Sequence, residues 1–159
     1  MKSLPHFKWS NPIHLLALGF GSGAAPKAPG TFGTLIGVLF YFPMAYLSQP
    51  HYLVLVGFLF VAGIYICGRT AKDFGVHDHG SIVWDEIVGY LITMIFAPTG
   101  WPWVVLGFVL FRIFDIWKPW PISLLDKKVH GGLGIMIDDV LAGVYAMGVM
   151  AIVNVCLQL

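Results

Sequence analysis

The chain has 159 residues, of which 58% are hydrophobic and only 11% are charged. Soluble domains are about a quarter charged, and a core of this size cannot hide so much apolar surface. The composition therefore excludes an ordinary soluble domain and predicts an integral membrane protein. The net charge of +1, without clustered basic residues, excludes a nucleic-acid partner.

The apolar runs predict an all-α fold, because backbone groups in lipid must be satisfied internally and the runs show no strand-like alternation. We expect one integral-membrane domain over residues 1–159. A helix over 11–20, with Pro12 in its first turn, is too short to cross and should lie at the interface or re-enter the membrane. About five spans should follow, over 31–47, 52–68, 87–97, 103–111 continuing towards 117, and 140–159.

Several of these runs are shorter than the roughly 20 residues of an ideal span, so we expect tilt or extension. The third becomes adequate only if its helix starts near Ile82, and the fifth should start near Ile135. Both extensions bring carboxylates into the helices.

The charges sort between the two sides that five spans would create. Lysine and arginine occur in the N-terminal segment, the 69–86 loop and the 118–135 loop, whereas 48–51, 98–102 and the C-terminus have none. By the positive-inside rule the first side is cytoplasmic, and the acids of the third and fifth spans fall at their cytoplasmic ends. Cys67 and Cys156 lie in apolar runs without CxxC spacing, so we expect free thiols.

The first polar cluster is GFGSGAAPKAPGTFGT, residues 19–34, whose glycines and prolines leave no room for regular helix. Lys27, Thr31 and Thr34 supply polar groups before an apolar helix begins. A glycine-rich loop leading into a helix can bind an anion, but the spacing is not that of a P-loop, and a simple tight turn is at least as good an interpretation.

The second cluster is HDHGSIVWDEIVG, residues 77–89. Asp85 and Glu86 precede an apolar run, and ionised groups in a membrane helix persist where they are paired or functional; the alternative is that one of them only faces water. The HDH triplet suggests zinc or an ordinary loop, yet no further Cys or His lies nearby and oxygen donors dominate. Mg²⁺ is the better prediction, with His79 near the site.

The third cluster is FRIFDIWKPWP, residues 111–121, in which Arg112, Asp115 and Lys118 recur every three residues. A helix would stack them on one face before the prolines end it. They could form a salt-bridge ladder, but burying such a ladder in lipid gains little, so we favour an active-site role.

The fourth cluster is HGGLGIMIDDVLAG, residues 130–143. Its glycines should make a tight turn, leaving Asp138 and Asp139 near a helix N-terminus, where the dipole favours negative charge. Consecutive helical residues point about 100° apart, so we expect one carboxylate to bind metal and the other to act behind it or as a base.

Together these clusters predict a metal and phosphate site on the cytoplasmic side. Asp85, Glu86, Asp138 and Asp139 offer metal ligands, and Asp115 offers a further carboxylate. The groups expected to bind phosphate are Lys27, Thr31, His79, Arg112 and Lys118. Gathered carboxylates need a compensating charge, and Mg²⁺ with a substrate phosphate is the simplest one.

The four motifs, in this order over most of the chain, resemble the phosphatidylglycerophosphatase A family. The resemblance implies a multi-pass phosphatase of the bacterial inner membrane that depends on Mg²⁺. It implies that phosphatidylglycerophosphate is hydrolysed to phosphatidylglycerol and phosphate; a homo-oligomer is compatible with it. The motifs of cysteine, aspartyl-phosphate and histidine phosphatases are missing, which leaves metal-assisted attack by water.

Two alternative functions stay open: a transporter, and a phosphatase with another substrate. Intramembrane acids also mark cation or proton pathways, but a transporter predicts carboxylates through the membrane depth and on both sides. A phosphatase for another lipid phosphate would have the same residues, and only its substrate would distinguish it.

Overall fold

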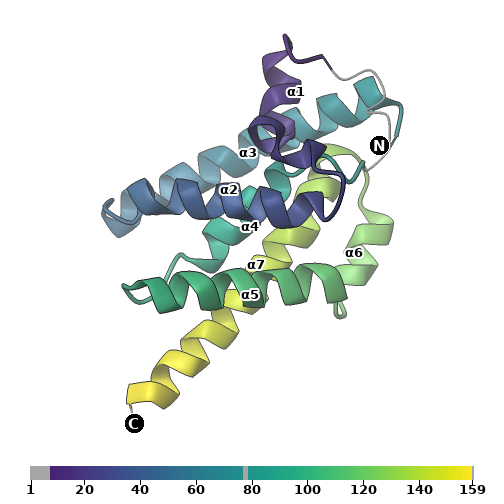
Figure 1. Ribbon diagram of the computed structural model, residues 1–159. Helices are drawn as coiled ribbons and strands as arrows, with labels where there is room; N and C mark the ends of the chain where they lie inside the picture. The colour runs from purple at the N-terminus through teal and green to yellow at the C-terminus, as the bar shows by residue number, and fades with distance from the viewer. Residues whose placement is uncertain (1–7, 77–78, 159) are drawn as a thin grey trace.

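The computed structural model describes residues 8–76 and 79–158, and every regular element in these ranges is a helix (Figure 1), which confirms the all-α prediction. His77 and Asp78 of the second cluster lie outside the described residues. In chain order the helices are α1 (Pro12–Ala17), the 3-10 helix η1 (Gly19–Ala24), α2 (Pro29–Met44), α3 (Gln49–Phe74), α4 (Trp84–Thr93), α5 (Trp101–Trp117), α6 (Ile122–Lys128) and α7 (Gly131–Gln158).

Helices α2, α3, α4, α5 and α7 alternate in direction, so their connections gather at two ends (Figure 1). At one end the turn before α3 and the turn after α4 lie side by side. A hydrogen bond joins them there, from the Gln49 side-chain amide to the Ile95 carbonyl at 2.8 Å. The other end holds the N-terminal elements, residues 79–83 and α6. The two ends are the two sides into which the sequence sorts its charges.

Two helices, Gln49–Phe74 and Gly131–Leu157, are long and apolar enough to cross a membrane. Large apolar side chains such as Phe42, Phe58 and Ile116 are exposed on the outer surface, as expected where lipid is the solvent. Helices α2, α4 and α5 are shorter, with 16, 10 and 17 residues. Five crossings therefore stay a prediction.

Helix α4 is the centre of the fold. It packs against α2, α3, α5 and α7, and all of its residues except Glu86 are buried. Ten residues rise about 15 Å, half of a hydrocarbon layer of about 30 Å. Because other helices enclose it, α4 does not have to reach both polar layers to satisfy its backbone.

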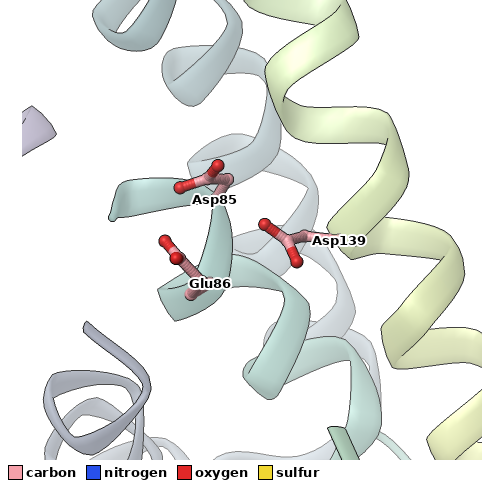
Figure 2. A group of neighbouring side chains, drawn as sticks. All are labelled: Asp85, Glu86 and Asp139. Carbon is pink, nitrogen blue, oxygen red and sulfur yellow. The ribbon is translucent and has the colours of Figure 1, made fainter. Parts of the chain in front are cut away.

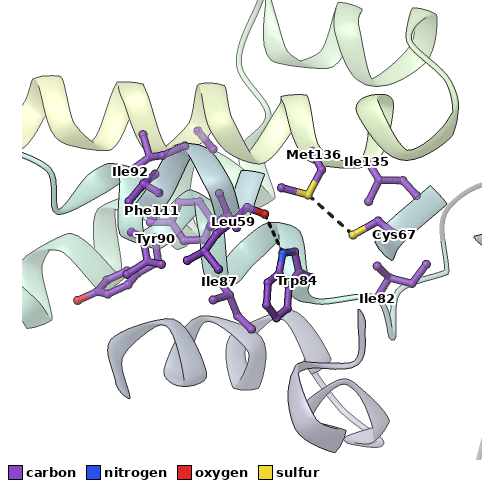
Figure 3. Close-up of a cluster of buried hydrophobic side chains, with 14 of the residues drawn as sticks. Leu59, Cys67, Ile82, Trp84, Ile87, Tyr90, Ile92, Phe111, Ile135 and Met136 are labelled. Carbon is purple, nitrogen blue, oxygen red and sulfur yellow. Dashed lines mark hydrogen bonds between the residues drawn. The ribbon is translucent and has the colours of Figure 1, made fainter. Parts of the chain in front are cut away.

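The apolar core forms around α4, where side chains of α3, α5 and α7 meet (Figure 3). Tyr90 and Phe111 are among its largest fully buried side chains. Two polar contacts fix the packing: the Trp84 indole donates to the Leu59 carbonyl at 3.2 Å, and the Cys67 thiol lies 3.8 Å from the Met136 sulfur. The core thus ties the first turn of α4 to α3 and α7.

Several predicted helix boundaries were wrong. Helix α4 starts at Trp84, not Ile82, and ends at Thr93, four residues before the predicted end of its run. Helix α7 starts at Gly131, so the HGGLG glycines form its first turns and not a preceding loop. Within residues 19–34, η1 and the start of α2 at Pro29 fill much of the stretch predicted to lack helix.

The start of α1 and the end of α5 agree with the sequence, although α1 ends at Ala17 and not at the predicted residue 20. Asn11 caps α1, its side chain accepting from the Ile13 amide at 3.0 Å, and Pro12 is the first helical residue. Helix α5 ends at Trp117, just before the Lys118–Pro119 step, as predicted.

Candidate active site

The first turn of α4 presents two neighbouring carboxylates, Asp85 and Glu86. Upstream, the Val83 amide donates to the Ala17 carbonyl at 2.8 Å, which anchors the entry to the helix. Helix α2 approaches closely here, because a Cβ on Gly33 would lie 2.5 Å from the Val83 Cβ. The acids are therefore held by packed backbone on several sides.

Helix α7 brings Asp139 to the same place because two glycines let it approach α4. A Cβ on Gly143 would lie 2.4 Å from the Gly89 carbonyl oxygen, and a Cβ on Gly89 would lie 2.8 Å from the Asp139 carbonyl oxygen. Larger residues at either glycine would push the helices apart, and with them the carboxylates.

Asp85, Glu86 and Asp139 form what we call the carboxylate group. One carboxylate oxygen from each lies within 4.8 Å of the others, and Figure 2 shows the three side chains facing one another across α4 and α7. Asp85 and Asp139 are only 7% and 3% exposed. Carboxylates this close repel one another unless protons or cations compensate them.

The carboxylate group also has oxygens that no other described group satisfies. Asp85 Oδ1, Glu86 Oε2 and Asp139 Oδ1 are buried without a hydrogen-bond partner among the described residues. Buried polar atoms are normally paired, so such orphans indicate a missing partner. Three hard oxygen donors directed into one buried space fit a divalent cation such as Mg²⁺.

Arg112 and Asp115 of α5 border the carboxylate group. They form an ion pair, and a Cβ on Gly30 would lie 2.3 Å from Glu86 Oε1 and 2.9 Å from Arg112 Nη1. Asp115 interacts electrostatically with both Glu86 and Asp139. The first turn of α2 therefore covers a place where a guanidinium and the carboxylates converge.

A second cluster, which we call the lysine tie, consists of Lys118, Asp126 and Asp138. Lys118 Nζ lies 2.9 Å from Asp126 Oδ1 and 2.6 Å from Asp138 Oδ2, which joins the end of α5 to α6 and α7. Burial lowers the pKa of Lys118, but the hydrogen bonds and charges of the two aspartates outweigh it and raise the pKa above its ordinary range. The ammonium therefore stays charged at neutral pH.

The prediction that Arg112, Asp115 and Lys118 stack on one face of a helix holds for only two of them. Arg112 and Asp115 pair on the helix, but Lys118 lies beyond it with a left-handed backbone (φ 45°) and faces α6 and α7. Asp138 and Asp139 were expected near a helix N-terminus, whereas they lie two turns inside α7. Their side chains go to different clusters, Asp138 to the lysine tie and Asp139 to the carboxylate group.

In the described part of the chain, the remaining predicted phosphate-binding residues form no hydrogen bond or ion pair with either cluster. Lys27 is exposed before α2 and has no ion pair with a described residue, and Thr31 is half-buried in the first turn of α2. The Thr34 hydroxyl donates to the Gly30 carbonyl at 2.8 Å. His79 accepts from the Ser81 amide at 3.3 Å and packs edge-on against Phe74.

Sequence reasoning missed two features of the site. Gly30 is the residue of the glycine-rich segment that meets Glu86 and Arg112, and Asp126 is the second partner of Lys118. A glycine between Pro29 and the predicted apolar run at Thr31 was the available signal for a close approach. No comparable signal distinguished Asp126 from other loop acids.

Comparison with known proteins identifies the family. The model of the family Phosphatidylglycerophosphatase A matches residues 15–154. The Escherichia coli (strain K12) protein named phosphatidylglycerophosphatase A is 55% identical over 144 residues, which cover 90% of this chain and 84% of that protein. The Haemophilus influenzae protein of the same name is 51% identical over 139 residues, covering 86% of this chain and 85% of that protein.

A third relative carries a different name. A Bacteroides thetaiotaomicron protein named "Putative phosphatidylinositol-3-phosphatase" is 40% identical over 147 residues, covering 87% of this chain and 91% of that protein. No solved structure matches the chain significantly. By the family match and the two closely similar relatives, this chain belongs to the phosphatidylglycerophosphatase A family, a family of phosphatase enzymes.

Proposed function

We propose that the chain hydrolyses phosphatidylglycerophosphate to phosphatidylglycerol and phosphate, with Mg²⁺, at the cytoplasmic face of the bacterial inner membrane. The observation that carries the proposal is the carboxylate group, with its orphaned oxygens beside Arg112. A bound cation would be enough to compensate the charge of the acids. The adjoining guanidinium could in addition bind an anionic phosphate.

Asp85, Glu86 and Asp139 would hold the metal. Mg²⁺ bound there would polarise the phosphoryl group and lower the pKa of a bound water. Its charge would also offset the repulsion among the three carboxylates, which their burial otherwise makes costly.

The residues of the chain then divide the remaining tasks. Arg112 is oriented by Asp115 and would bind the non-bridging phosphate oxygens above Gly30. Asp115, which interacts electrostatically with Glu86 and Asp139, would accept the proton of the attacking water. A P–O bond to water forms as the P–O bond to the lipid glycerol breaks, and the leaving oxygen takes up a proton.

Asp138 and Lys118 have a positioning role in this scheme. Their 2.6 Å ion pair fixes the turn of α7 that carries Asp139 and the end of α5 that carries Asp115. Lys27, Thr31 and His79, which lie towards the same end of the molecule, are candidates for contacts with the lipid headgroup.

The arrangement of charge supports the cytoplasmic placement. The described lysines and arginines, Arg112 in α5 excepted, belong to the end that holds α6 and the N-terminal elements, and the opposite turns carry none. All buried carboxylates of the described chain lie in α4 and α7 towards the charged end. A transporter would need such acids along a path to the other side, so this distribution favours an enzyme.

Release of inorganic phosphate by the purified full-length chain tests the proposal. Phosphatidylglycerophosphate with Mg²⁺ should be hydrolysed, and chelation of the metal should abolish the activity. In ¹⁸O-enriched water a single turnover should label the released phosphate directly. Hydrolysis unaffected by chelators, or a trapped aspartyl phosphate, would contradict the proposed mechanism.

The name of the Bacteroides relative motivates a second candidate, a phosphatase for another lipid phosphate. The same assay with phosphatidylinositol 3-phosphate and phosphatidic acid distinguishes the candidates. Faster turnover of either lipid than of phosphatidylglycerophosphate would reassign the substrate without changing the site.

A further inference from the structure

A cavity of about 720 Å³, which we call the α3–α7 groove, lies on the outer surface between the second half of α3 and the start of α7. Its volume falls within the range of about 300–1,000 Å³ typical of small-molecule sites. None of the residues of the carboxylate group or the lysine tie lines it. The residues that line it have no role in the proposed function.

The cavity is apolar along one part and cationic at the other. The apolar part is lined by Val61, Ile64 and Tyr65, from the middle of α3. The cationic part is lined by Arg69 and Lys72, near the end of that helix. From Val61 to Lys72 the helix rises about 16 Å. Val61 and Tyr65 are 65% and 63% exposed, so this wall faces outward.

The floor of the cavity is closed by a backbone contact between α3 and α7. A Cβ on Gly132 would lie 1.8 Å from the Ile64 carbonyl oxygen, and a Cβ on Gly68 would lie 3.1 Å from the Gly132 Cα. On the inner side of α3, a Cβ on Gly63 would meet Met136 at 2.7 Å. The groove is therefore separated from the buried carboxylates by packed helices.

The cationic part has one positive charge in excess. Arg69 Nε pairs with Asp73 at 3.3 Å, and the Asp73 carboxylate also lies 3.1 Å from buried His14. Lys72 is exposed, and the structure gives it no ion pair with any described side chain. With Arg69 offset by Asp73, the site complements one negative charge and not two.

The position of the groove along α3 also matches that of a membrane lipid. Its apolar wall lies inside a helix long enough to cross a membrane, and its cations lie in the last two turns of that helix. A lipid aligned with α3 would place its acyl chain on Val61 and Tyr65 and its phosphate at Arg69 and Lys72. Long cationic side chains at helix ends are suited to reach the headgroup layer.

From this match of shape and charge, we propose that the α3–α7 groove is a binding site for a monoanionic phosphodiester phospholipid, separate from the catalytic site. The acyl chain lies along the apolar wall, and Arg69 and Lys72 bind the single phosphate. The proposal does not depend on the chain being a phosphatase.

The test is lipid retention by the full-length chain in native mass spectrometry, with dioleoyl phosphatidylglycerol and dioleoyl phosphatidylcholine as probes. The unaltered chain should retain the anionic lipid preferentially. The double variant Arg69→Gln/Lys72→Gln should lose about tenfold in affinity for phosphatidylglycerol, since each cation contributes to the attraction of anionic lipid. Retention of phosphatidylcholine should change little.

Two matched variants keep the outcome interpretable. Lys8→Gln/Lys128→Gln removes two exposed cations outside the groove and should leave retention unchanged, and the charge-preserving Arg69→Lys/Lys72→Arg should retain the lipid. Equal retention of both lipids by the unaltered chain, an equal loss in the Lys8 and Lys128 variant, or a dimer that excludes lipid would overturn the proposal. No turnover is needed, so failure here is distinct from failure of the phosphatase assay.

Discussion

The carboxylate group and the lysine tie lie next to each other in the chain, because consecutive residues of α7, Asp139 and Asp138, belong to one each. In the lysine tie, Lys118 lies within 3 Å of both acids, so each acid has a cationic partner inside the protein. In the carboxylate group, none of the three acids forms an ion pair with a described cation, and the neighbouring Arg112 is already paired with Asp115. We therefore infer that the metal binds at the carboxylate group, where the acids lack a cationic partner inside the protein, and not at the lysine tie.

The two clusters should therefore respond oppositely to neutral substitutions. In the carboxylate group an amide removes repulsion and a metal ligand together, so activity falls while the metal-free fold becomes more stable. In the lysine tie an amide breaks an ion pair, so stability falls first.

Asp139→Asn should have the largest effect. Removal of a metal ligand and of charge stabilisation is expected to lower kcat/KM by about 10²- to 10³-fold. The melting temperature measured with EDTA should rise, because one buried negative charge is gone. Phosphate release and thermal unfolding in detergent check the two parts, and a variant that is both active and less stable would contradict the role of Asp139.

Gly30→Ala should have the next largest effect on activity. The new methyl group would lie 2.3 Å from Glu86 Oε1 and 2.9 Å from Arg112 Nη1, so the ends of these flexible side chains must move. Misplacement by about 1 Å can cost about 10²-fold in rate.

Gly57→Ala is the matched control for that variant. It also lies within a helix, but its Cβ would have no heavy atom within 4 Å. Its activity should equal that of the unaltered chain, and its melting temperature should be equal or slightly higher, since alanine favours helix. Equal loss of activity in both variants would show that helix propensity, and not the site, is responsible.

Asp138→Asn should reduce activity by about tenfold, because it acts on the site through the position of α7 and not through the metal. It should also lower the melting temperature, since Lys118 keeps only Asp126 as a partner. Loss of activity as large as that of Asp139→Asn, without loss of stability, would place Asp138 in the carboxylate group.

The pH dependence of the lysine tie is the smallest expected effect. Because the folded pKa of Lys118 is raised above its unfolded value, its stabilising contribution is complete below the unfolded pKa and is lost only as pH rises through the folded value. The difference in melting temperature between the unaltered chain and Asp138→Asn should thus stay constant from about pH 7 to 9. A difference that vanishes in this range would contradict a charged, ion-paired lysine.

Much of the fold could be predicted because hydrophobic runs and prolines are local signals. The helix start at Pro12, the end of α5 before Pro119 and the approximate extents of α2, α3 and α5 follow from such signals. The short α4 could not be predicted from its run, because its length depends on the helices that enclose it.

The candidate site was predictable as a set of residue types but not as a geometry. Adjacent acids at Asp85–Glu86 and Asp138–Asp139 suggested metal binding, yet nothing local shows that Asp138 turns to Lys118 while Asp139 meets Asp85. That division depends on the close approach of α4 and α7 at Gly89 and Gly143, which are far apart in sequence.

Thermal unfolding titrated with Mg²⁺ tests the difference between the two clusters most directly. The unaltered chain and Asp138→Asn should both gain stability as Mg²⁺ is added, because binding to the folded state alone stabilises it by mass action. Asp139→Asn should show no such gain. A gain retained by Asp139→Asn and lost by Asp138→Asn would contradict the assignment of the metal to Asp85, Glu86 and Asp139.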